Sequence, residues 1–269
     1  MSVKLIAVDM DGTFLDDQKQ YNHEYFDQLY RKMKQQHVEF VVASGNQYYQ
    51  LSEFFAPYKE EITFVAENGG NIYLHNEPIY HAKVPKNVNA KVAQTLSHYK
   101  PDFIVACGFK SAYALDGLTD EEYKMASFFF PQIQKVHALE DIEDDIIKYS
   151  LDFAAAKTSP IRDQINEELN NELVLVPTGG GGIDLILPKV HKATGIKKVQ
   201  EQLGIADDEV AAFGDNGNDK EMLNHAKYSF AMGNATDEIK GIARNVIGNN
   251  NDEAVLKTID QLLTENEQN

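Results

Sequence analysis

The chain has 269 residues, of which 43% are hydrophobic and 25% are charged, a composition typical of globular proteins. This length predicts one large domain or two smaller ones. Acidic residues (42) outnumber basic residues (25), and the formal net charge is -17. Such a charge argues against a nucleic-acid partner, because nucleic acids are bound largely by basic residues that neutralise phosphates. A small phosphate ester would need positive charge placed locally at its site.

Cysteine usage and hydropathy favour a cytoplasmic protein. The one cysteine, Cys107, cannot form an intramolecular disulfide and has no thiol partner for a zinc cluster, which suits a reducing compartment. We interpret it as a small core residue. The sequence has no cleavable signal and no apolar run of about 18 residues, so we expect no membrane association.

The N-terminal part predicts a β-α-β unit. Residues 4–8 and 38–43 are short apolar runs of strand-forming residues, separated by a polar stretch with apolar residues at helical spacing. Because both runs are apolar almost throughout, we expect strands buried on both faces, as in a parallel sheet covered by helices. Residues 210–213 have the same character late in the chain. Each of the three runs leads into a polar or glycine-containing turn, and ligands of open α/β sheets bind at such strand ends.

The middle of the chain, residues 84–187, is interpreted as an inserted α+β domain. Strand-like segments such as residues 103–107 and 183–187 alternate there with helical ones. Residues 158–160 (Thr-Ser-Pro) have the form of a helix start, with the serine able to cap and the proline preset for the first turn. The glycine run at residues 179–182 is either a flexible linker or, as we favour, a loop that approaches another group closely.

After residue 192 the pattern returns to alternating helices and strands. We expect a helix ended by Gly204, the strand at residues 210–213 and a helix around Met222. Residues 264–269 are expected to be a disordered tail. Before this tail, the last helix presents to the core an apolar face formed by Val255, Leu256, Ile259, Leu262 and Leu263.

Together these elements predict an α/β fold with two domains. The first, residues 1–83 and 188–269, is a Rossmann-like core with a parallel sheet and helices on both faces. The second is the α+β domain of residues 84–187, inserted into the core.

Asp9 and Asp11 lie two residues apart in the turn after the first predicted strand. The segment consists of turn-forming residues, so an ordinary β-turn is one interpretation. A calcium loop is excluded, because Thr13 stands where a third acid is needed and Phe14 where a glycine is needed. The chemical interpretation is that one carboxylate attacks an electrophile while the other transfers protons. Gly12 would let the backbone approach a ligand closely.

A second acidic turn, residues 214–219, follows the predicted strand near the C-terminus. It supplies hard oxygen ligands, Asp215 among them, of the kind that a magnesium ion prefers. Asp9, Asp11 and Asp215 together would repel a phosphate ester unless a divalent cation bridged carboxylate and phosphate. We therefore expect Mg2+ as the cofactor.

Lys192, at a predicted helix start, and Ser44-Gly45, at a strand end, offer an ammonium, a hydroxyl and backbone N–H groups for the remaining phosphate charge. Together with the two acidic turns, and in this order along the chain, they resemble the four motifs of the haloacid dehalogenase-like phosphatases. The resemblance covers essentially the whole chain, because the inserted domain matches the α+β cap of the Cof-type subfamily. Within that subfamily, bacterial broad-specificity sugar phosphatases are similar at residues 44–50 (SGNQYYQ), 64–69 (FVAENG) and 228–235 (YSFAMGNA).

The resemblance implies a role for each motif residue. Asp9 would be the nucleophile that forms a phosphoaspartyl intermediate, and Asp11 would protonate the leaving alkoxide and then activate water. Magnesium would be bound by the Asp9 carboxylate, the Asp11 backbone carbonyl and Asp215, while Asp219 would orient the loop or reach the ion through water. The phosphate-binding groups would be the Met10 backbone amide, Ser44, Gly45, Lys192 and Asn218.

One departure from the family pattern concerns the residue after the Ser-Gly pair. Many relatives carry Arg there, whereas this chain has Asn46, as in the sugar-phosphatase branch. The change leaves one fewer positive charge beside the site, which puts in doubt the binding of substrates with a second phosphate. Asn46, Glu67 and Asn68 either meet sugar hydroxyls or, equally, are turn residues that bond their own backbone.

Substrate specificity is expected to depend on the inserted domain. In the family, the cap loop faces the catalytic end of the core, which implies that Gly180, Gly181 and Asp184 contact the non-phosphate part of the substrate. Tyr48 and Tyr49 would either stack on a sugar ring or pack in the core, and we favour core packing for at least one of them. The eight histidines show no paired spacing, so we assign them no metal site.

The expected function is a magnesium-dependent phosphatase acting on sugar phosphates and related small monoesters. A sugar phosphomutase would use the same intermediate but return the phosphoryl group to another hydroxyl. A receiver-like regulator would keep its phosphoaspartate as a signal, although Asp11 favours rapid turnover. The expected partners are small phosphorylated metabolites, with no nucleic acid, membrane or obligatory protein partner, and the oligomeric state stays open.

Overall fold

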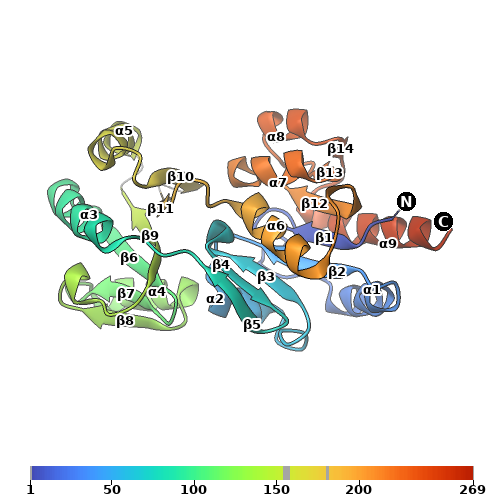
Figure 1. The fold of residues 1–269 in the computed structure, drawn as a ribbon, viewed down its shortest axis with the longest axis horizontal. Coiled ribbons are helices and arrows are strands. Elements are labelled where there is room, and N and C mark those ends of the chain that lie inside the picture. Colours follow the sequence, from blue (N-terminus) through green and yellow to red (C-terminus); the bar gives the residue numbers. More distant parts are fainter. Residues whose placement is uncertain (1, 154–157, 180–181, 269) are drawn as a thin grey trace.

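Two sheets divide the chain into two parts (Figure 1). The structure, a computed structural model, describes residues 2–153, 158–179 and 182–268. The first and last segments of the chain form the core sheet, and the middle segment forms the sheet of the cap. The predicted α/β fold with a second, inserted sheet is therefore confirmed.

The core sheet is mixed rather than wholly parallel. Its strand order among the described residues is β14-β13-β12-β1-β2-β3-β4-β5, with parallel pairing from β14 to β3 and antiparallel pairing from β3 to β5. The predicted parallel sheet is thus correct for its central strands and wrong for one edge. The strands are β1 (Leu5–Val8), β2 (Glu39–Ala43), β3 (Thr63–Ala66), β4 (Asn71–Leu74), β5 (Glu77–His81), β12 (Val210–Gly214), β13 (Tyr228–Ala231) and β14 (Asn245–Val246).

Backbone turns explain why the edge strands reverse direction. After β3, the 3-10 turn η1 (Glu67–Gly69) has positive φ at each of its three residues, and this folds the chain back antiparallel. At Gly69 a Cβ atom would lie 2.4 Å from the His191 carbonyl oxygen, so glycine is required. Between β4 and β5, His75 and Asn76 both have positive φ, as in a two-residue hairpin turn.

Helices cover both faces of the core sheet. Neighbouring side chains of a strand point to opposite faces of the sheet. In β3, Phe64 packs against Phe55, which follows α2, and Val65 packs on the other face against Gly195 of α6. This arrangement buries β1 and β12 along their whole length and β2 at all but its first residue, as predicted, and it also buries β3, which was not predicted. The core helices are α1 (His23–Gln35), α2 (Tyr48–Phe54), α6 (Lys192–Leu203), α7 (Lys220–His225), α8 (Asp237–Ile242) and α9 (Ala254–Glu267), with the 3-10 turns η4 (Asp207–Glu209), η5 (Gly217–Asp219) and η6 (Asn250–Asp252).

The cap sheet has the order β10-β11-β9-β6-β7-β8 in the described residues and is antiparallel except for the parallel pair β7 and β8. Its helices also lie on two faces: Ala106 clusters with residues of α3 and α5, and Cys107 clusters with Ala126 of α4. The Cys107 side chain is buried, which confirms its interpretation as a core residue. The cap elements are β6 (Phe103–Gly108), β7 (Ala112–Leu115), β8 (Ile133–Val136), β9 (Ile146–Asp152), β10 (Val174–Gly179), β11 (Gly182–Ile186), α3 (Lys86–Tyr99), α4 (Asp120–Phe129), α5 (Thr158–Leu169) and η2 (Leu139–Asp141).

The chain passes between the two sheets after β5 and again before α6. Both passages lie near the proposed boundaries of the inserted domain, residues 84–187, which we retain as a proposal. Of the glycine run, Gly179 ends β10 and Gly182 begins β11, whereas Gly180 and Gly181 lie outside the described residues. The helix expected at residues 158–160 begins at Thr158, one residue before the serine proposed as its cap.

The C-terminal segment differs from its prediction. Residues 264–267 continue α9 instead of forming a disordered tail. The Asn266 side chain explains this order, because its oxygen accepts the Val3 backbone N–H at 3.0 Å and its Nδ2 donates to the Val3 carbonyl at 2.9 Å. The predicted end of α6 is correct, since Gly204 follows it with φ +67°. No helix in the described residues combines the length and apolarity needed to cross a bilayer.

The paired bonds of Asn266 predict a stabilising role for this residue. Replacing it with alanine removes both bonds to the Val3 backbone, so Asn266→Ala should lower the free energy of unfolding by about 1–2 kcal/mol in urea titrations. Gln268→Ala, at an exposed position beyond the same helix, is the control and should change it by less than about 0.5 kcal/mol. Equal losses in the two variants would contradict the assignment.

Candidate active site

Three neighbouring parallel strands bring the predicted motifs to one edge of the core sheet. β1 pairs with β12 on one side and with β2 on the other. Residues that follow these strands, namely Asp9, Ser44 and Asp215, therefore lie at the same carboxyl edge. Asp9 and Ser44 are buried, with 6% and 2% of their surface exposed.

Lys192 connects the two acidic turns. It is the first residue of α6, its side chain has no exposed surface, and its Nζ lies 2.5 Å from Asp9 Oδ1 and 2.6 Å from Asp219 Oδ1. Burial lowers the pKa of an ammonium, but the charges of Asp219 and Asp9 offset this and hold the pKa of Lys192 above its ordinary value. Lys192 therefore stays charged between two carboxylates.

Asp219 fixes the shape of the second acidic turn. Its Oδ2 accepts the backbone N–H groups of Asp215 at 2.9 Å and Asn216 at 3.0 Å, while its Oδ1 accepts from Lys192. Both oxygens of Asp219 are thus occupied by the protein itself. The Thr13 hydroxyl donates to Asp215 Oδ1 at 2.9 Å and joins the first acidic turn to the second.

The carboxylates outnumber the positive charge that faces them. Ligand atoms of Asp9, Asp215 and Asp219 lie within 4.8 Å of one another. At an effective dielectric constant of about 20, two such charges repel by at least roughly 3 kcal/mol. Burial raises the pKa of Asp9 well above its usual range, with a further increase from Asp219. Burial and then Asp219 raise the pKa of Asp215 to about 6.

This surplus of negative charge fits a divalent cation with oxygen ligands. Asp9 and Asp215 supply carboxylate oxygens at the sheet edge, which are donors that magnesium prefers. Asp219 belongs to the same cluster, but its oxygens already hold Lys192 and the turn amides. The donor set therefore suits Mg2+, with Asp219 supporting the loop. The Asp11 carboxylate is not part of this cluster, and the contribution of the Asp11 backbone carbonyl stays a proposal.

Asp11 is held at the surface by two partners that sequence reasoning did not pair with it. Lys19 Nζ lies 2.5 Å from Asp11 Oδ1, and Asn46 Nδ2 donates to Asp11 Oδ2 at 2.9 Å. The Asp11 side chain is 43% exposed, so it has direct access to water. A turn in which Asp16 Oδ1 accepts the Gln20 backbone N–H at 2.8 Å brings Lys19 to this position.

The proposed phosphate-binding groups lie around the end of β2. The Ser44 hydroxyl oxygen accepts the Asn46 backbone N–H at 3.1 Å. A Cβ atom on Gly45 would lie 3.2 Å from Asn68 Oδ1, and Asn218 Nδ2 donates to that same Asn68 oxygen at 3.2 Å. Met10 buries its side chain in the core, which leaves its backbone for the turn. The motifs at Gly45 and Asn218 are thus brought together through Asn68.

A buried cluster that sequence reasoning missed lies beside these groups. Lys148 Nζ donates to the Gly45 carbonyl at 2.7 Å and lies 2.8 Å from Asp184 Oδ2 and 2.9 Å from Glu67 Oε2. Asn68 Nδ2 donates to Asp184 Oδ2 at 3.1 Å. The signal available in the sequence was a lysine in the middle of the strand-like run IIKYSL at residues 146–151.

Two further candidates pack into the protein. The Tyr48 ring stacks on Tyr73 with centroids 3.6 Å apart, and its hydroxyl donates to Asn76. Core packing is therefore correct for Tyr48. Tyr49 is half-buried and packs against the core.

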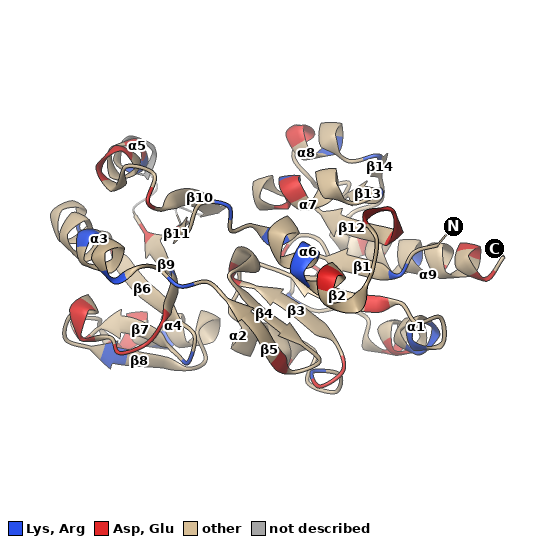
Figure 2. Ribbon diagram, viewed as in Figure 1, with Lys and Arg blue, Asp and Glu red and all other residues tan. Residues whose placement is uncertain are grey.

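Positive charge at the site comes from individual buried lysines rather than from a basic surface. Figure 2 shows the Lys and Arg positions of the described residues dispersed among acidic ones over both parts of the ribbon. Lys192 and Lys148 are both buried and both lie beside the proposed site. Lys192 offers local charge of the kind that a phosphate ester would need in an acidic protein, whereas the ammonium of Lys148 faces Glu67 and Asp184.

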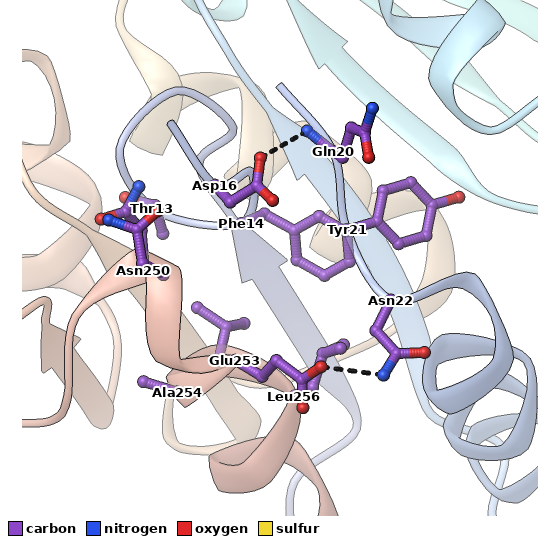
Figure 3. A pocket seen from close by; sticks show the side chains of 12 residues that line it. Thr13, Phe14, Asp16, Gln20, Tyr21, Asn22, Asn250, Glu253, Ala254 and Leu256 are labelled. Carbon is purple, nitrogen blue, oxygen red and sulfur yellow. Dashed lines mark hydrogen bonds between the residues drawn. The ribbon is translucent and has the colours of Figure 1, made fainter. Parts of the chain in front are cut away.

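A separate cavity of about 270 Å³ lies beside the loop that follows Asp11. Figure 3 shows side chains from the loop and from the start of α9 around it, with Asn22 hydrogen-bonded to Glu253. Thr13 lines this cavity, but Asp9 and Asp215 do not. We therefore assign the chemistry to the sheet edge and not to the cavity.

Gly12 is required at the junction of the two acidic turns. Its φ is +79°, and a Cβ atom there would lie 2.7 Å from Asp215 Oδ2. Gly12→Ala should lower the free energy of unfolding by about 1–2 kcal/mol through backbone strain. It should also displace Asp215 and sharply reduce metal-dependent phosphate release from acetyl phosphate.

Gly204→Ala is the matched control for this prediction. Gly204 has a φ of +67° but no atom within 4 Å of an added Cβ, so it tests the strain alone. Urea unfolding should report a similar loss of stability for this variant, with the rate of phosphate release unchanged. A Gly12→Ala enzyme that is destabilised but fully active would contradict the proposed contact with Asp215.

Comparisons with known proteins agree with this geometry. The family model of haloacid dehalogenase-like hydrolases matches residues 6–259. The chain is 44% identical over 98% of its length to the 5-amino-6-(5-phospho-D-ribitylamino)uracil phosphatase YbjI of Escherichia coli, covering 97% of that protein. It is 26% identical over 96% of its length to the phosphatase YcsE of Bacillus subtilis, named for the same substrate, and covers 95% of it.

A solved structure gives the same result for the fold. SMU.1108c from Streptococcus mutans superposes with a TM-score of 0.90 at 34% identity, covering 98% of this chain and 100% of that one. The family model spans the core motifs and the inserted cap together. The chain therefore belongs to the haloacid dehalogenase-like hydrolase family and is a Cof-type phosphatase.

Proposed function

We propose that this phosphatase hydrolyses a small phosphomonoester whose leaving group is a polyol or sugar, through a phosphoaspartyl intermediate on Asp9. The observation that carries the proposal is the buried contact between Lys192 and Asp9 at the sheet edge, beside Asp215 and Asp219. The substrate proposed first is 5-amino-6-(5-phospho-D-ribitylamino)uracil, for which the Escherichia coli relative is named. Sugar phosphates share its phosphorylated polyhydroxyl chain and are the second class.

The first half of the reaction transfers the phosphoryl group to the enzyme. Asp9 attacks phosphorus with its carboxylate oxygen, a new P–O bond forms, and the bond to the leaving alkoxide breaks. Asp11 gives its proton to that alkoxide, which leaves as an alcohol. Asp11 is suited to this exchange because its side chain is 43% exposed and can be reprotonated from solvent.

The second half regenerates the carboxylate. Asp11, now ionised, accepts a proton from a water molecule that attacks phosphorus. The bond between phosphorus and the Asp9 oxygen breaks, and inorganic phosphate leaves. This use of one residue as acid and then as base favours rapid turnover over a long-lived phosphoaspartate.

In the proposed mechanism, the residues around Asp9 balance the charge of the carboxylate and orient the phosphoryl group. Lys192 opposes the rise in the pKa of Asp9, and its ammonium lies 2.5 Å from the carboxylate oxygen Oδ1 of Asp9. We propose that Ser44, the backbone N–H groups of Met10 and Gly45, and Asn218 hold the phosphoryl oxygens. Mg2+, held by Asp9, Asp215 and the Asp11 backbone carbonyl, would supply positive charge that polarises the phosphoryl group.

Asn46 supports a substrate with one phosphate. Its amide donates to Asp11 and brings no positive charge to the site. We propose that Asn46 meets hydroxyl groups of the leaving group when the substrate displaces it from Asp11. We retain Gly180, Gly181 and Asp184 as proposed determinants of specificity, although the two glycines lie outside the described residues and Asp184 would act through its buried contacts.

Substitution of the two catalytic aspartates should separate their roles. Asp9→Asn removes the nucleophile and should lower kcat by more than about a thousandfold. Asp11→Asn removes proton transfer and should cost about 10²–10⁴-fold on an alkyl ester, with a smaller loss on acetyl phosphate because its leaving group needs no proton. Phosphate release under steady-state and single-turnover conditions measures both. Near-normal metal-dependent activity in Asp9→Asn would overturn the mechanism.

A substrate panel tests the leaving group and the cofactor. Phosphate release should be highest with phosphoribitylaminouracil or sugar phosphates, lower with nucleotides, and abolished when EDTA removes Mg2+. Restoring Mg2+ should restore the rate. An isomerised sugar phosphate without free phosphate would indicate a mutase instead, and a stable acyl phosphate on Asp9 would indicate a regulator.

A further inference from the structure

Lys148 is a buried charge from the cap that the phosphatase mechanism does not use. It lies on β9, and only 3% of its surface is exposed. Burial lowers the pKa of its ammonium, but Asp184 and Glu67 more than offset this and hold the pKa above its ordinary value. A permanently charged lysine is therefore enclosed at this position.

The partners of Lys148 come from both domains. Asp184 is a cap residue on β11, whereas Glu67 and Gly45 follow core strands β3 and β2. In the cap sheet, Lys148 pairs with Ile186 and Asp184 pairs with Ser150, so Lys148 and Asp184 are diagonal neighbours on one face. One ammonium thus joins that cap face to the core.

The core side of this cluster is the proposed phosphate cradle. Lys148 Nζ donates a hydrogen bond to the carbonyl of Gly45, and the backbone N–H of the same residue is one of the proposed phosphate-binding groups. Backbone bonds tie η1 to this loop, because Glu67 N–H donates to the Asn46 carbonyl and Asn68 N–H donates to the Ser44 carbonyl. The Asn68 side chain then links Asp184 to Asn218.

Stability alone is a poor explanation for this cluster. A buried ion pair is commonly no more stabilising than an apolar replacement of similar volume. Here two carboxylates face one ammonium, and Asp184 Oδ1 is buried without a hydrogen-bond partner among the described residues. Burial also raises the pKa of Glu67, which Lys148 opposes. The cluster is better explained by its directional contacts, since Lys148 bonds both to the cap and to the core.

We infer that Lys148 is a positioning residue of the phosphatase, which closes the cap on the core and positions Asn68 for binding of the leaving group. The inference rests on the proposed function. Lys148 anchors the cap to the core at the Gly45 carbonyl and acts through Asp184 on Asn68, so its loss loosens the cap and the Asn68 side chain together. Substrates whose leaving group reaches the cap depend on this closure, whereas acetyl phosphate, with a very small leaving group, depends on it little.

The test compares Lys148→Met with wild type on two substrates. On the preferred polyol phosphate, KM should rise about tenfold while kcat falls less, and on acetyl phosphate kcat/KM should change by less than about threefold. Lys135→Met, an exposed lysine of strand β8, is the matched control and should leave both unchanged. Equal losses on both substrates would overturn the positioning role.

A second variant separates positioning from folding. Lys148→Met leaves the carboxylates of Glu67 and Asp184 buried without their cation, which is expected to destabilise the protein. A triple variant that adds Glu67→Gln and Asp184→Asn removes all three charges while keeping side chains of nearly the same shape. This triple variant should regain stability in urea but keep the substrate-dependent rise in KM. Recovery of wild-type KM would overturn the inference, because stability would then explain the defect.

A readout without substrate distinguishes this inference from the proposed function. Amide hydrogen exchange should accelerate at residues 44–50 and 64–70 in Lys148→Met and in the triple variant, but not in Lys135→Met. Unchanged exchange would overturn the positioning role even in an active phosphatase. A wild-type enzyme inactive on every ester would overturn the proposed function instead, whatever the exchange result.

Discussion

The arrangement of this protein depends on surplus negative charge at the carboxyl edge of the core sheet. Asp9, Asp215 and Asp219 converge there, and Lys192 is enclosed between two of them. Helix α6 must therefore begin at the end of β1 and β12, although it follows the cap in sequence. Helix α6 can begin there because Gly69, which lies against the His191 carbonyl just before the helix, has no side chain to clash with it.

Each of the two domains contributes one buried lysine to the region of the proposed site. Lys192 belongs to the core and faces the carboxylate that would react, whereas Lys148 belongs to the cap and faces the loop that would hold phosphate. Asn68 stands between these systems, with contacts to Asp184 of the cap and Asn218 of the core. The site is thus built from short polar contacts across two sheets in a protein whose net charge is -17.

The sequence allowed prediction of features that follow from local order along the chain. Apolar runs followed by acidic or small residues located Asp9, Ser44 and Asp215, because parallel strands bring their ends together. The direction of β4 was not predictable from its apolar pattern, since positive φ at Glu67 and Asn68 decides it. The helical conformation of the last residues was missed because their polar composition is typical of a disordered tail, and the two hydrogen bonds between Asn266 and Val3 cannot be read from composition. Lys148 was missed because its partners are distant in sequence, and an isolated strand lysine is ordinarily exposed.

The position of β1 sets an order on the formation of the sheet. β1 lies between β2 and β12, and Leu5 pairs with Val210. During synthesis, β1 can pair with β2 early, but its other edge stays open until the whole cap has been translated. Such a non-local pairing closes a very long loop and is intrinsically slow. The cap sheet, contiguous in sequence, can form first and leave the apolar edge of β1 as the segment most in need of protection from aggregation.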